Sequence, residues 1–430
     1  MNTLRAVKGM NDLFEDELLT WRHVERVMRE VFVAHGFGEV RTPLVEETEL
    51  YVRGVGEGTD IVGKEMFRVV RAPATGEPVD AAESLTLRPE GTAGVVRAMI
   101  ENGKVIADSY QKVFYAGPMF RAERPAKGRY RQFHQLGCET LGYAEPAADV
   151  EVIALVHMLL GKLGVPAKLM LSSLGDAGAD RQKYNDALRG YFASHQGALS
   201  DDSKRRLVTN PLRILDSKDA GDQKLVVGAP KPLEFLSDAA RAHFDAVKAG
   251  LEALSVPYTI DATIVRGLDY YTRTVFEFVG EAGLGAQSTV AAGGRYDGLV
   301  SELGGRPTPA VGFAAGIERL ILVMKATGHT VAETPPDLVL VSADDAGRAM
   351  CAQLAYALRR DGVRVGVDLR GRSVKAQFKS ATNTAARFTI MVGSSEIAAG
   401  NGELKAKASS TVQAVVALDA ASIKAALSTP

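Results

Sequence analysis

The sequence has little of several things, and each shortage excludes a class of protein. Only two of its 430 residues are cysteines, Cys138 and Cys351, which are too few for a disulfide framework and indicate a reducing compartment. The first residues carry scattered charges and lack the apolar stretch of a signal peptide. No apolar run approaches the roughly 20 residues that a membrane-spanning helix needs. We therefore expect a cytoplasmic protein with no membrane contact.

A strong net charge is also lacking. The chain has 51 lysines and arginines against 52 aspartates and glutamates, a formal net charge of −1. No global field draws such a protein to a polyanion, so any contact with nucleic acid must come from local patches. Hydrophobic content is 46%, as in ordinary globular proteins, and the length suffices for two or three domains with substantial cores.

Residues 115–139, YAGPMFRAERPAKGRYRQFHQLGCE, form a dense basic stretch. Pro125 and Gly128 mark a turn between two potential strands, residues 112–121 and 131–138. We predict a hairpin whose loop carries five cations within eleven positions: Arg121, Arg124, Lys127, Arg129 and Arg131. Arginine binds phosphate oxygens through its planar guanidinium, although charge alone would favour a solvated hairpin tip.

The second predicted strand of this hairpin favours a binding site over a solvated tip. Gln132, His134, Gln135 and Glu139 interrupt an otherwise apolar run. Polar groups that enter a core must find hydrogen-bond partners, so they often line a site. His134 and Cys138 could suggest a metal, but two candidate ligands do not make a four-coordinate zinc site. A hydrogen-bonded histidine and a small buried thiol are the preferred interpretation.

The N-terminal part predicts a helix over residues 17–35, ended by Gly36, and a strand over 38–45 interrupted by Pro43. A strand at 85–87 leads through Glu90 and Thr92 into a helix over 93–100, where these two side chains either cap the helix or face a cleft. Residues 58–64, GTDIVGK, nearly match a phosphate-binding P-loop. Glu65 stands where that loop requires Ser or Thr, so we exclude it.

After the hairpin, the pattern predicts a helix over residues 149–163 and a strand over 167–172. Residues 175–255 are polar and helical, typical of an inserted domain, and their basic cluster at residues 204–206 predicts a solvated helix face. Strands follow at 258–265, 274–279 and 311–315, with a glycine-dense turn over 293–298 that opens a helix to 303. Arg319 begins a further helix against the helix dipole, which indicates a bound partner.

The last hundred residues are set off by a linker over residues 328–336. Predicted strands at 338–342, 363–367 and 388–392 alternate with helices at 346–360 and 373–386. Further strands are expected within 403–418. This alternation indicates a small α/β domain over residues 337–430.

Five stretches point to one family. The predicted N-terminal helix leads into GFGEVRTPLVEE, around Pro43. Phe120-Arg121-Ala122-Glu123 lies in the hairpin, and GFAAGIERL ends at Arg319-Leu320. VRGLDYYTRTVFE covers residues 265–277, and AGGRYDGL covers 292–299. In this order they resemble motifs 1, 2 and 3 and the two histidine-specific signatures of the bacterial histidyl-tRNA synthetase family of class II aminoacyl-tRNA synthetases. The resemblance spans essentially the whole chain.

This resemblance implies an α+β fold. An antiparallel-sheet catalytic domain would occupy residues 1–174 and 256–327, with a helical insertion at 175–255 that grips the tRNA acceptor arm. The C-terminal α/β domain would read the anticodon, and motif 1 would form a homodimer. The implied reaction is ligation of L-histidine to tRNA(His) through histidyl-adenylate, with ATP as substrate, Mg²⁺ bound to the ATP, and release of AMP and pyrophosphate.

The family's site residues carry over to matching positions. Arg121 would hold the α-phosphate, Arg129 and Arg319 the distal phosphates, and Phe133 and Glu123 the adenine, with Arg266 as an additional cation at the α-phosphate. The acceptors for the α-amino group of histidine would be Glu90, Thr92 and Gln135. Glu139 and the Tyr271 hydroxyl would bind the two imidazole nitrogens, and Tyr270 and Tyr296 would line the same pocket.

Two alternatives share this fold. A synthetase-like regulatory subunit of histidine biosynthesis usually lacks the anticodon domain and loses motif residues, whereas residues 337–430 and Arg121, Arg266 and Arg319 are present. A non-catalytic module that senses uncharged tRNA would not need the full set of arginines. Both therefore rank below an active ligase.

Overall fold

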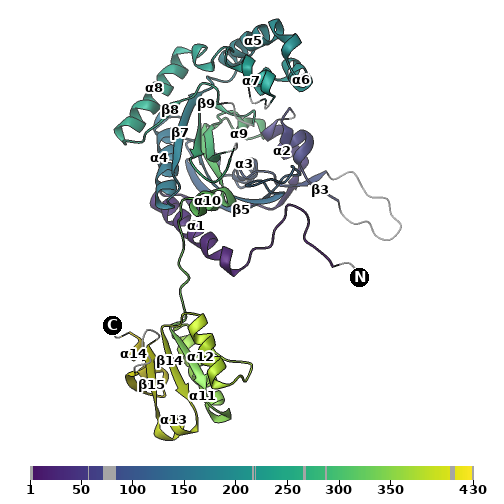
Figure 1. Cartoon of the computed structure of the whole chain (residues 1–430). Coiled ribbons are helices and arrows are strands. Elements are labelled where there is room, and N and C mark those ends of the chain that lie inside the picture. Colours follow the sequence, from purple (N-terminus) through teal and green to yellow (C-terminus); the bar gives the residue numbers. More distant parts are fainter. Residues whose placement is uncertain are drawn as a thin grey trace, which may run out of the picture. The chain divides into compact units, whose positions relative to one another are not determined.

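The computed structural model describes residues 3–56, 58–70, 84–215, 217, 219–264, 268–285, 288–406 and 412–428. The chain divides into two compact units, Met1–Val331 and Ala332–Pro430 (Figure 1). None of the described helices is long and apolar enough to cross a membrane.

The first unit is built on an eight-stranded sheet. In spatial order its strands are β1 (Gly38–Glu39), β5 (Gln111–Phe120), β6 (Gln132–Leu141), β11 (Ala310–Gly316), β10 (Thr289–Arg295), β9 (Thr272–Gly280), β7 (Ala167–Ser173) and β8 (Thr259–Ile260). The short edge strands β1 and β8 pair in parallel with their neighbours, and the six strands between them pair antiparallel. The predicted antiparallel α+β architecture is confirmed.

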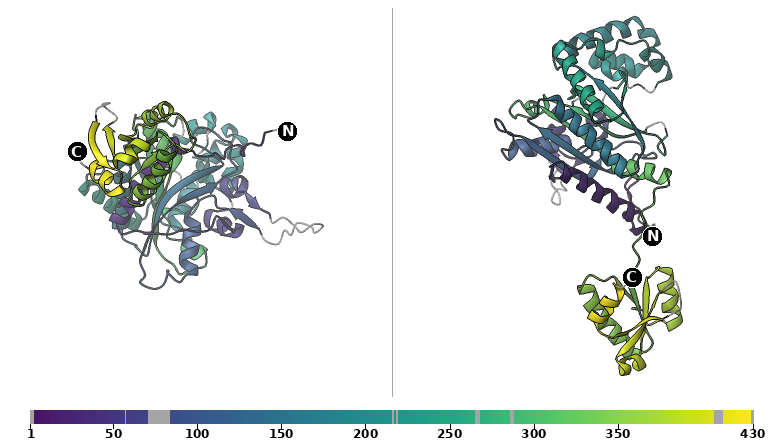
Figure 2. Two further views of the ribbon diagram at one scale, coloured as in Figure 1. Left: turned by 90° about the horizontal axis from the view of Figure 1, so that it is seen from below. Right: turned by 90° about the vertical axis from the view of Figure 1, so that its left-hand side faces the viewer.

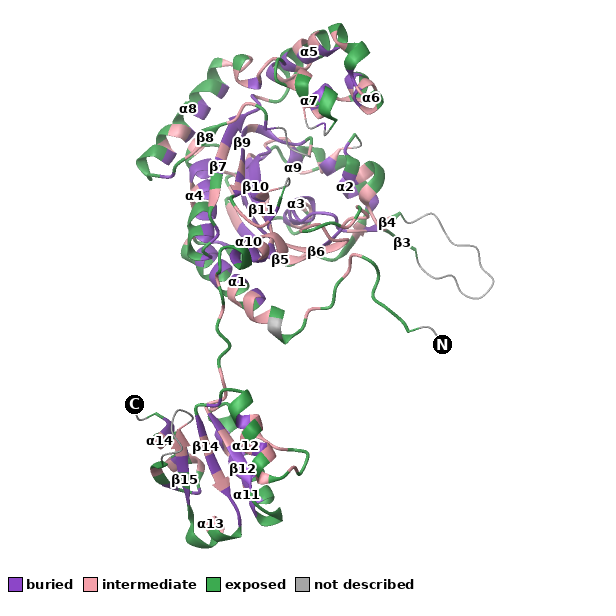
Figure 3. Cartoon of the chain, in the orientation of Figure 1, coloured by how far each residue is buried: buried purple, intermediate pink, exposed green. Residues whose placement is uncertain are grey.

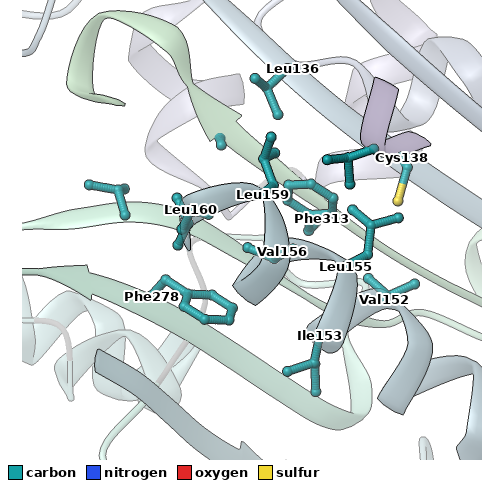
Figure 4. Close-up of a cluster of buried hydrophobic side chains, with 14 of the residues drawn as sticks. Leu136, Cys138, Val152, Ile153, Leu155, Val156, Leu159, Leu160, Phe278 and Phe313 are labelled. Atoms are coloured by element: carbon teal, nitrogen blue, oxygen red, sulfur yellow. The ribbon is translucent and has the colours of Figure 1, made fainter. Parts of the chain in front are cut away.

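One face of this sheet carries the main hydrophobic core. Four helices contribute apolar residues to it: α1 (Glu15–Ala34), α4 (Pro146–Lys162), α8 (Asp238–Ala253) and α10 (Ile317–Ala326). Val152, Leu155 and Val156 of α4 pack toward Cys138 of β6 and Phe313 of β11 (Figure 4). Figure 3 shows buried residues concentrated on these central strands and on α4. Burial of this apolar surface is the main source of stability for the unit.

The opposite face of the sheet is lined differently. Because side chains alternate along a strand, Phe133, Gln135 and Glu139 of β6 project away from the face that holds Leu136 and Cys138. A second cluster covers this face, with α3 (Thr92–Glu101) and α9 (Leu299–Glu302) contributing apolar side chains. The alternation of side chains along β6 thus directs one set into the hydrophobic core and the other toward the opposite face of the sheet.

A smaller sheet and helix complete this side of the unit. The strands β2 (Val45–Glu47), β4 (Leu85–Leu87) and β3 (Arg68–Val69) pair antiparallel in that order. They are joined by α2 (Thr48–Val55) and a π-helical turn, η1 (Ile61–Glu65), and α2 contacts both α3 and α9.

Residues 175–255 form the predicted helical segment. It contains α5 (Ala179–Ser194), α6 (Asp201–Thr209), α7 (Ala220–Val226) and α8, with short 3-10 turns that include η3 (Pro211–Ile214). A small core of its own includes Tyr184, Leu188 and Phe192. Figure 2 shows these helices gathered at one end of the first unit.

The second unit is a five-stranded sheet with helices. Its order is β13 (Val365–Val367), β12 (Leu338–Ser342), β14 (Phe388–Val392), β15 (Asn401–Ala406) and β16 (Val412–Ala417). The first three strands are parallel and the last two antiparallel. The helices are α11 (Asp345–Arg360), α12 (Val374–Asn383), α13 (Ser394–Ala399) and α14 (Ala420–Leu427). The expected α/β fold is confirmed, with β12 and β14 at the predicted residues.

Three element predictions were wrong. Residues 38–45 do not form one strand: β1 ends at Glu39, and β2 begins after Pro43 in the other sheet. The strand predicted at 258–265 is limited to β8 among its described residues. Gly293 and Gly294 lie in β10 instead of a turn, because the sheet needs their lack of a side chain: a Cβ on Gly293 would lie 2.1 Å from the Gly312 carbonyl oxygen.

Candidate active site

A pocket opens on the face of the sheet opposite the α4 core. Its walls come from β6, β10 and β11, from the N-terminus of α3, from the loop that connects β5 and β6, and from the segment before β9. It contains every predicted site residue in the described part of the chain: Glu90, Thr92, Arg121, Glu123, Arg129, Phe133, Gln135, Glu139, Tyr270, Tyr271, Tyr296 and Arg319. Arg266 lies outside the described residues.

Glu139 is the buried carboxyl of the pocket. Its Oε1 accepts hydrogen bonds from Thr92 Oγ1 at 2.7 Å and from the Tyr115 hydroxyl at 3.4 Å, and its Oε2 accepts one from the Tyr296 hydroxyl. Burial raises the pKa of Glu139 to about 8, although these hydrogen bonds act in the opposite direction. Gly312 on β11 leaves room for this carboxyl, since a Cβ there would lie 1.8 Å from Oε2.

Three tyrosines form an aromatic wall beside this carboxyl. The ring centroids of Tyr270 and Tyr271 are 4.7 Å apart, and those of Tyr270 and Tyr296 are 5.5 Å apart at 64°. All three residues are buried. Aromatic rings with polar tips offer both a flat apolar surface and hydrogen-bonding groups, as a planar polar ligand requires.

The junction of β4 and α3 brings Glu90 to the pocket, and β6 adds Gln135. The carboxylate of Glu90 accepts from the backbone N–H of Thr92 at 2.6 Å and of Ala93 at 2.9 Å, so it caps α3 and also lines the pocket. Burial raises the pKa of Glu90. Gln135 Oε1 is buried without a hydrogen-bond partner among the described residues. An unpaired buried acceptor indicates that a ligand donor belongs there.

The other end of the pocket is cationic. Arg121 lies over the Phe133 ring, 5.2 Å from its centroid, and its Nε donates to the Pro89 carbonyl at 2.9 Å. Arg129 pairs with Glu123 at 3.2 Å. Burial lowers the pKa of Arg121, yet an arginine retains its charge at physiological pH.

Arg319 completes this cationic end from the first turn of α10, as predicted. Its Nε donates to the Gly128 carbonyl at 3.1 Å and its Nη1 to the Thr289 carbonyl at 2.9 Å. Burial lowers the pKa of Arg319, and repulsion from Arg129 acts in the same direction. Three guanidinium groups around one cavity make a site for a polyanion.

Sequence reasoning missed two supporting residues. The Glu318 carboxylate accepts the His134 backbone N–H at 2.9 and 3.0 Å and lies 3.0 Å from His134 Nδ1, which ties α10 to β6. Arg88 is buried and donates to the Pro118 carbonyl at 2.9 Å and to Thr42 at 3.0 Å. Glu318 lies in the stretch GFAAGIERL, and Arg88 lies two residues before Glu90. Only the fold reveals the partners of these two residues.

His134 and Cys138 have the surroundings that the sequence predicts. His134 is hydrogen-bonded, and Cys138 is a buried free thiol. Within the ranges that the structure covers, no group of three or more His, Cys, Asp or Glu side chains could hold a metal ion. The basic cluster on α6 forms ion pairs within its own helix, including Arg205 with Asp202 at 2.7 Å, and Arg206 also lies 3.7 Å from Asp60 outside this helix.

Comparisons with known proteins agree with this geometry. A family model described as "Histidyl-tRNA synthetase" matches residues 9–320, and one described as "Anticodon binding domain" matches residues 337–424. The chain is 50% identical to a histidine–tRNA ligase of Anaeromyxobacter dehalogenans, and 46% identical to one of Thiobacillus denitrificans. Each alignment spans 402 residues, 94% of both chains. The crystal structure of apo S. aureus histidyl-tRNA synthetase superposes with a TM-score of 0.81 at 32% identity, covering 98% of this chain and 99% of that one.

Proposed function

The chain belongs to the histidyl-tRNA synthetase family, and from this premise we propose how its pocket carries out the ATP-dependent ligation of histidine to tRNA(His). The chain is a class II histidine–tRNA ligase, since curated ligases 46–50% identical to it align over 94% of its length. The same match disfavours the regulatory-subunit and tRNA-sensing alternatives. The observation that carries the assignment of roles is the division of one pocket into a cationic end and a carboxyl–tyrosine end.

We place ATP at the cationic end. In the first step the carboxylate of histidine attacks the α-phosphorus of ATP and pyrophosphate leaves, so negative charge develops on phosphoryl oxygens. Arg121 binds the α-phosphate, and Arg129 and Arg319 bind the distal phosphates. Their backbone and Glu123 contacts fix these guanidinium groups before the substrate arrives, which reduces reorganisation during the reaction.

Adenine lies against Phe133 in this proposal, with its edge on Glu123. Arg266, matched through the family signature alone, supplies a further cation at the α-phosphate. Mg²⁺ would accompany ATP as part of the substrate, a common arrangement in which phosphate oxygens supply much of its coordination. It supplies further neutralisation of phosphate charge.

Histidine lies at the carboxyl–tyrosine end. Its cationic α-amino group donates to Glu90, Thr92 and Gln135, which accounts for the unpaired Gln135 Oε1. Glu139 accepts one imidazole N–H, and the Tyr271 hydroxyl engages the other ring nitrogen. An amino acid without ring nitrogens would form neither of these two hydrogen bonds, which disfavours its selection.

Transfer to tRNA involves the other parts of the chain. The 3′-terminal ribose hydroxyl attacks the activated carbonyl of histidyl-adenylate, and AMP leaves. Residues 175–255 contact the acceptor arm, and the unit beyond the linker at 328–336 reads the anticodon, in keeping with its family match. The motif 1 segment forms a homodimer interface, for which the short edge strand β1 is available. The compartment is the cytoplasm, where tRNA and ATP occur.

Pyrophosphate exchange across the amino acids tests this function. The protein is incubated with ATP, labelled pyrophosphate and each amino acid in turn, and only histidine should support exchange. Exchange supported by another amino acid, or a lack of exchange with every amino acid, would contradict the assignment. Aminoacylation of tRNA(His) by the same preparation tests the second step.

A further inference from the structure

The helical insertion contacts the loop that carries two tyrosines of the pocket. Asp269 directly precedes Tyr270 and Tyr271, and its Oδ1 accepts from Asn210 Nδ2 at 3.1 Å and from Arg213 Nη2 at 3.0 Å. Asn210 and Arg213 belong to the insertion, at the start of η3 and within it. The Arg213 side chain is 12% exposed, so this ion pair is shielded more than a surface pair would be.

The same aspartate is held from the opposite side by the catalytic domain. Its backbone N–H donates to the Val55 carbonyl at 3.3 Å, at the C-terminal end of α2. Gly56 has φ +100°, and a Cβ there would lie 2.8 Å from Asp269 Oδ2. The carboxylate therefore occupies a fixed place between the end of α2 and the insertion.

A third insertion residue contacts the loop two positions further on. Arg181 of α5 donates from Nη2 to the Tyr271 backbone carbonyl at 2.5 Å. Burial lowers the pKa of Arg181, and the charge of Asp269 opposes this. A buried guanidinium is costly unless it is hydrogen-bonded, so its placement on this carbonyl fixes the backbone beside the tyrosine ring.

We propose that Arg181, Asn210 and Arg213 are positioning residues for histidine. By holding Asp269 and the Tyr271 carbonyl, they keep the rings of Tyr270 and Tyr271 where they close the amino-acid end of the pocket. The insertion thereby takes part in amino-acid selection as well as in tRNA contact. This inference rests on the proposed location of histidine beside these tyrosines.

Asn210 offers the sharpest test, because it is a polar position where substitution need not disturb a core. Asn210→Asp places a second carboxylate against Asp269, so repulsion replaces a hydrogen bond. We expect the KM for histidine in pyrophosphate exchange to rise about tenfold, and about threefold in Asn210→Ala. The KM for ATP should change less than twofold, since Tyr270 and Tyr271 lie at the amino-acid end of the pocket, away from the proposed ATP site.

Arg213 provides a second set of variants with a rescue. Arg213→Ala should raise the KM for histidine by about tenfold. Arg213→Lys keeps the charge, so it should raise this KM by a smaller factor. Arg189→Ala is the matched control, because it removes an exposed ion pair with Asp186 on the same insertion. Its KM for histidine should stay at the wild-type value. Thermal unfolding of each variant verifies that it is folded.

The outcomes separate this inference from the pocket assignment. An unchanged KM for histidine in both Asn210→Asp and Arg213→Ala overturns the inference. An equal rise in the KM for histidine and the KM for ATP also overturns it, because it would indicate a merely structural role. Glu139→Gln is measured alongside. If it too leaves the KM for histidine unchanged, the proposed pocket itself has failed; if it raises that KM while the insertion variants do not, only the present inference has failed.

Discussion

The two ends of the pocket hold their charged groups in different ways. At the cationic end, Arg121 and Arg319 donate to backbone carbonyls, and of the three arginines there only Arg129 forms an ion pair within the described residues. At the other end Glu139 is held by three hydroxyl groups and by no cation of the described chain. Carbonyl acceptors therefore orient Arg121 and Arg319 at one end, whereas hydroxyl donors orient the Glu139 carboxyl at the other.

This difference determines what each end requires from its ligand. Backbone carbonyls orient the guanidinium groups but do not neutralise them, so the cationic end retains positive charge, as the phosphates that we propose to bind there require. Hydroxyl donors only partly offset the burial of Glu139, and its pKa of about 8 leaves much of the carboxyl protonated at neutral pH until a ligand N–H arrives. Under the proposed roles, the charge at the cationic end is therefore set before ATP binds, whereas the charge of Glu139 depends on the bound ligand.

Removal of an oriented arginine should cause the largest loss. Arg121→Ala should lower kcat for histidine-dependent pyrophosphate exchange by on the order of 10²–10³, the range for one electrostatic contact that strengthens in the transition state. Arg129→Ala should cost less, because Glu123 already shares its charge. Steady-state exchange kinetics measure both. Near wild-type kcat in Arg121→Ala would remove this residue from the mechanism and erase the proposed difference between the two ends.

A change at Glu139, in the carboxyl–tyrosine end, should alter the KM for histidine and leave the KM for ATP nearly unchanged. Glu139→Gln should raise the KM for histidine by roughly tenfold or more, because an amide accepts less strongly than a carboxylate and presents an N–H to the donors around it. The KM for ATP should remain within about twofold. Measurement of both KM values in one exchange assay decides the matter. A larger effect on ATP would place Glu139 outside the amino-acid end.

Much of this arrangement could be predicted from local pattern. The hairpin, the helix that begins near Arg319 and the alternation of the C-terminal domain all follow from turn residues and hydrophobic periodicity. The family motifs then supplied candidate residues, and the described ones all lie around one pocket. Local signals succeeded where each element carries its own pattern.

Other features depend on contacts between distant segments and could not be predicted. Gly293 was assigned to a turn, although the close approach of β11 at Gly312 places it in a strand. Arg295 is fully buried, and its ion pair with Asp149 joins residues 146 positions apart. The contact of Arg213 with Asp269 likewise links the insertion to the pocket. Such pairs are decided by tertiary packing and leave no periodic signal.

The unusual pKa of Glu139 should appear in the pH dependence of stability. A carboxyl whose pKa is raised on folding binds its proton more tightly in the folded than in the unfolded chain, so its contribution to the free energy of unfolding declines as pH rises from about 4.5 to about 8. The slope from this group is at most about 1.4 kcal/mol per pH unit. Denaturant unfolding of wild type and Glu139→Gln across this window isolates it. Parallel curves for the two proteins would contradict the raised pKa.

Removal of one hydroxyl donor to Glu139 should have the smallest effect on the KM for histidine. It tests directly how the carboxyl end of the pocket is held. Tyr296→Phe keeps the ring beside Tyr270 but removes the hydrogen bond to Glu139 Oε2. The ionised carboxyl loses a donor that lowers its pKa, so the pKa of Glu139 should rise further and the KM for histidine should increase about three- to tenfold at neutral pH. Tyr115→Phe tests a donor on Oε1 in the same way. A fall in the KM for histidine in either variant would show that the hydroxyl groups compete with the ligand for Glu139 instead of orienting it.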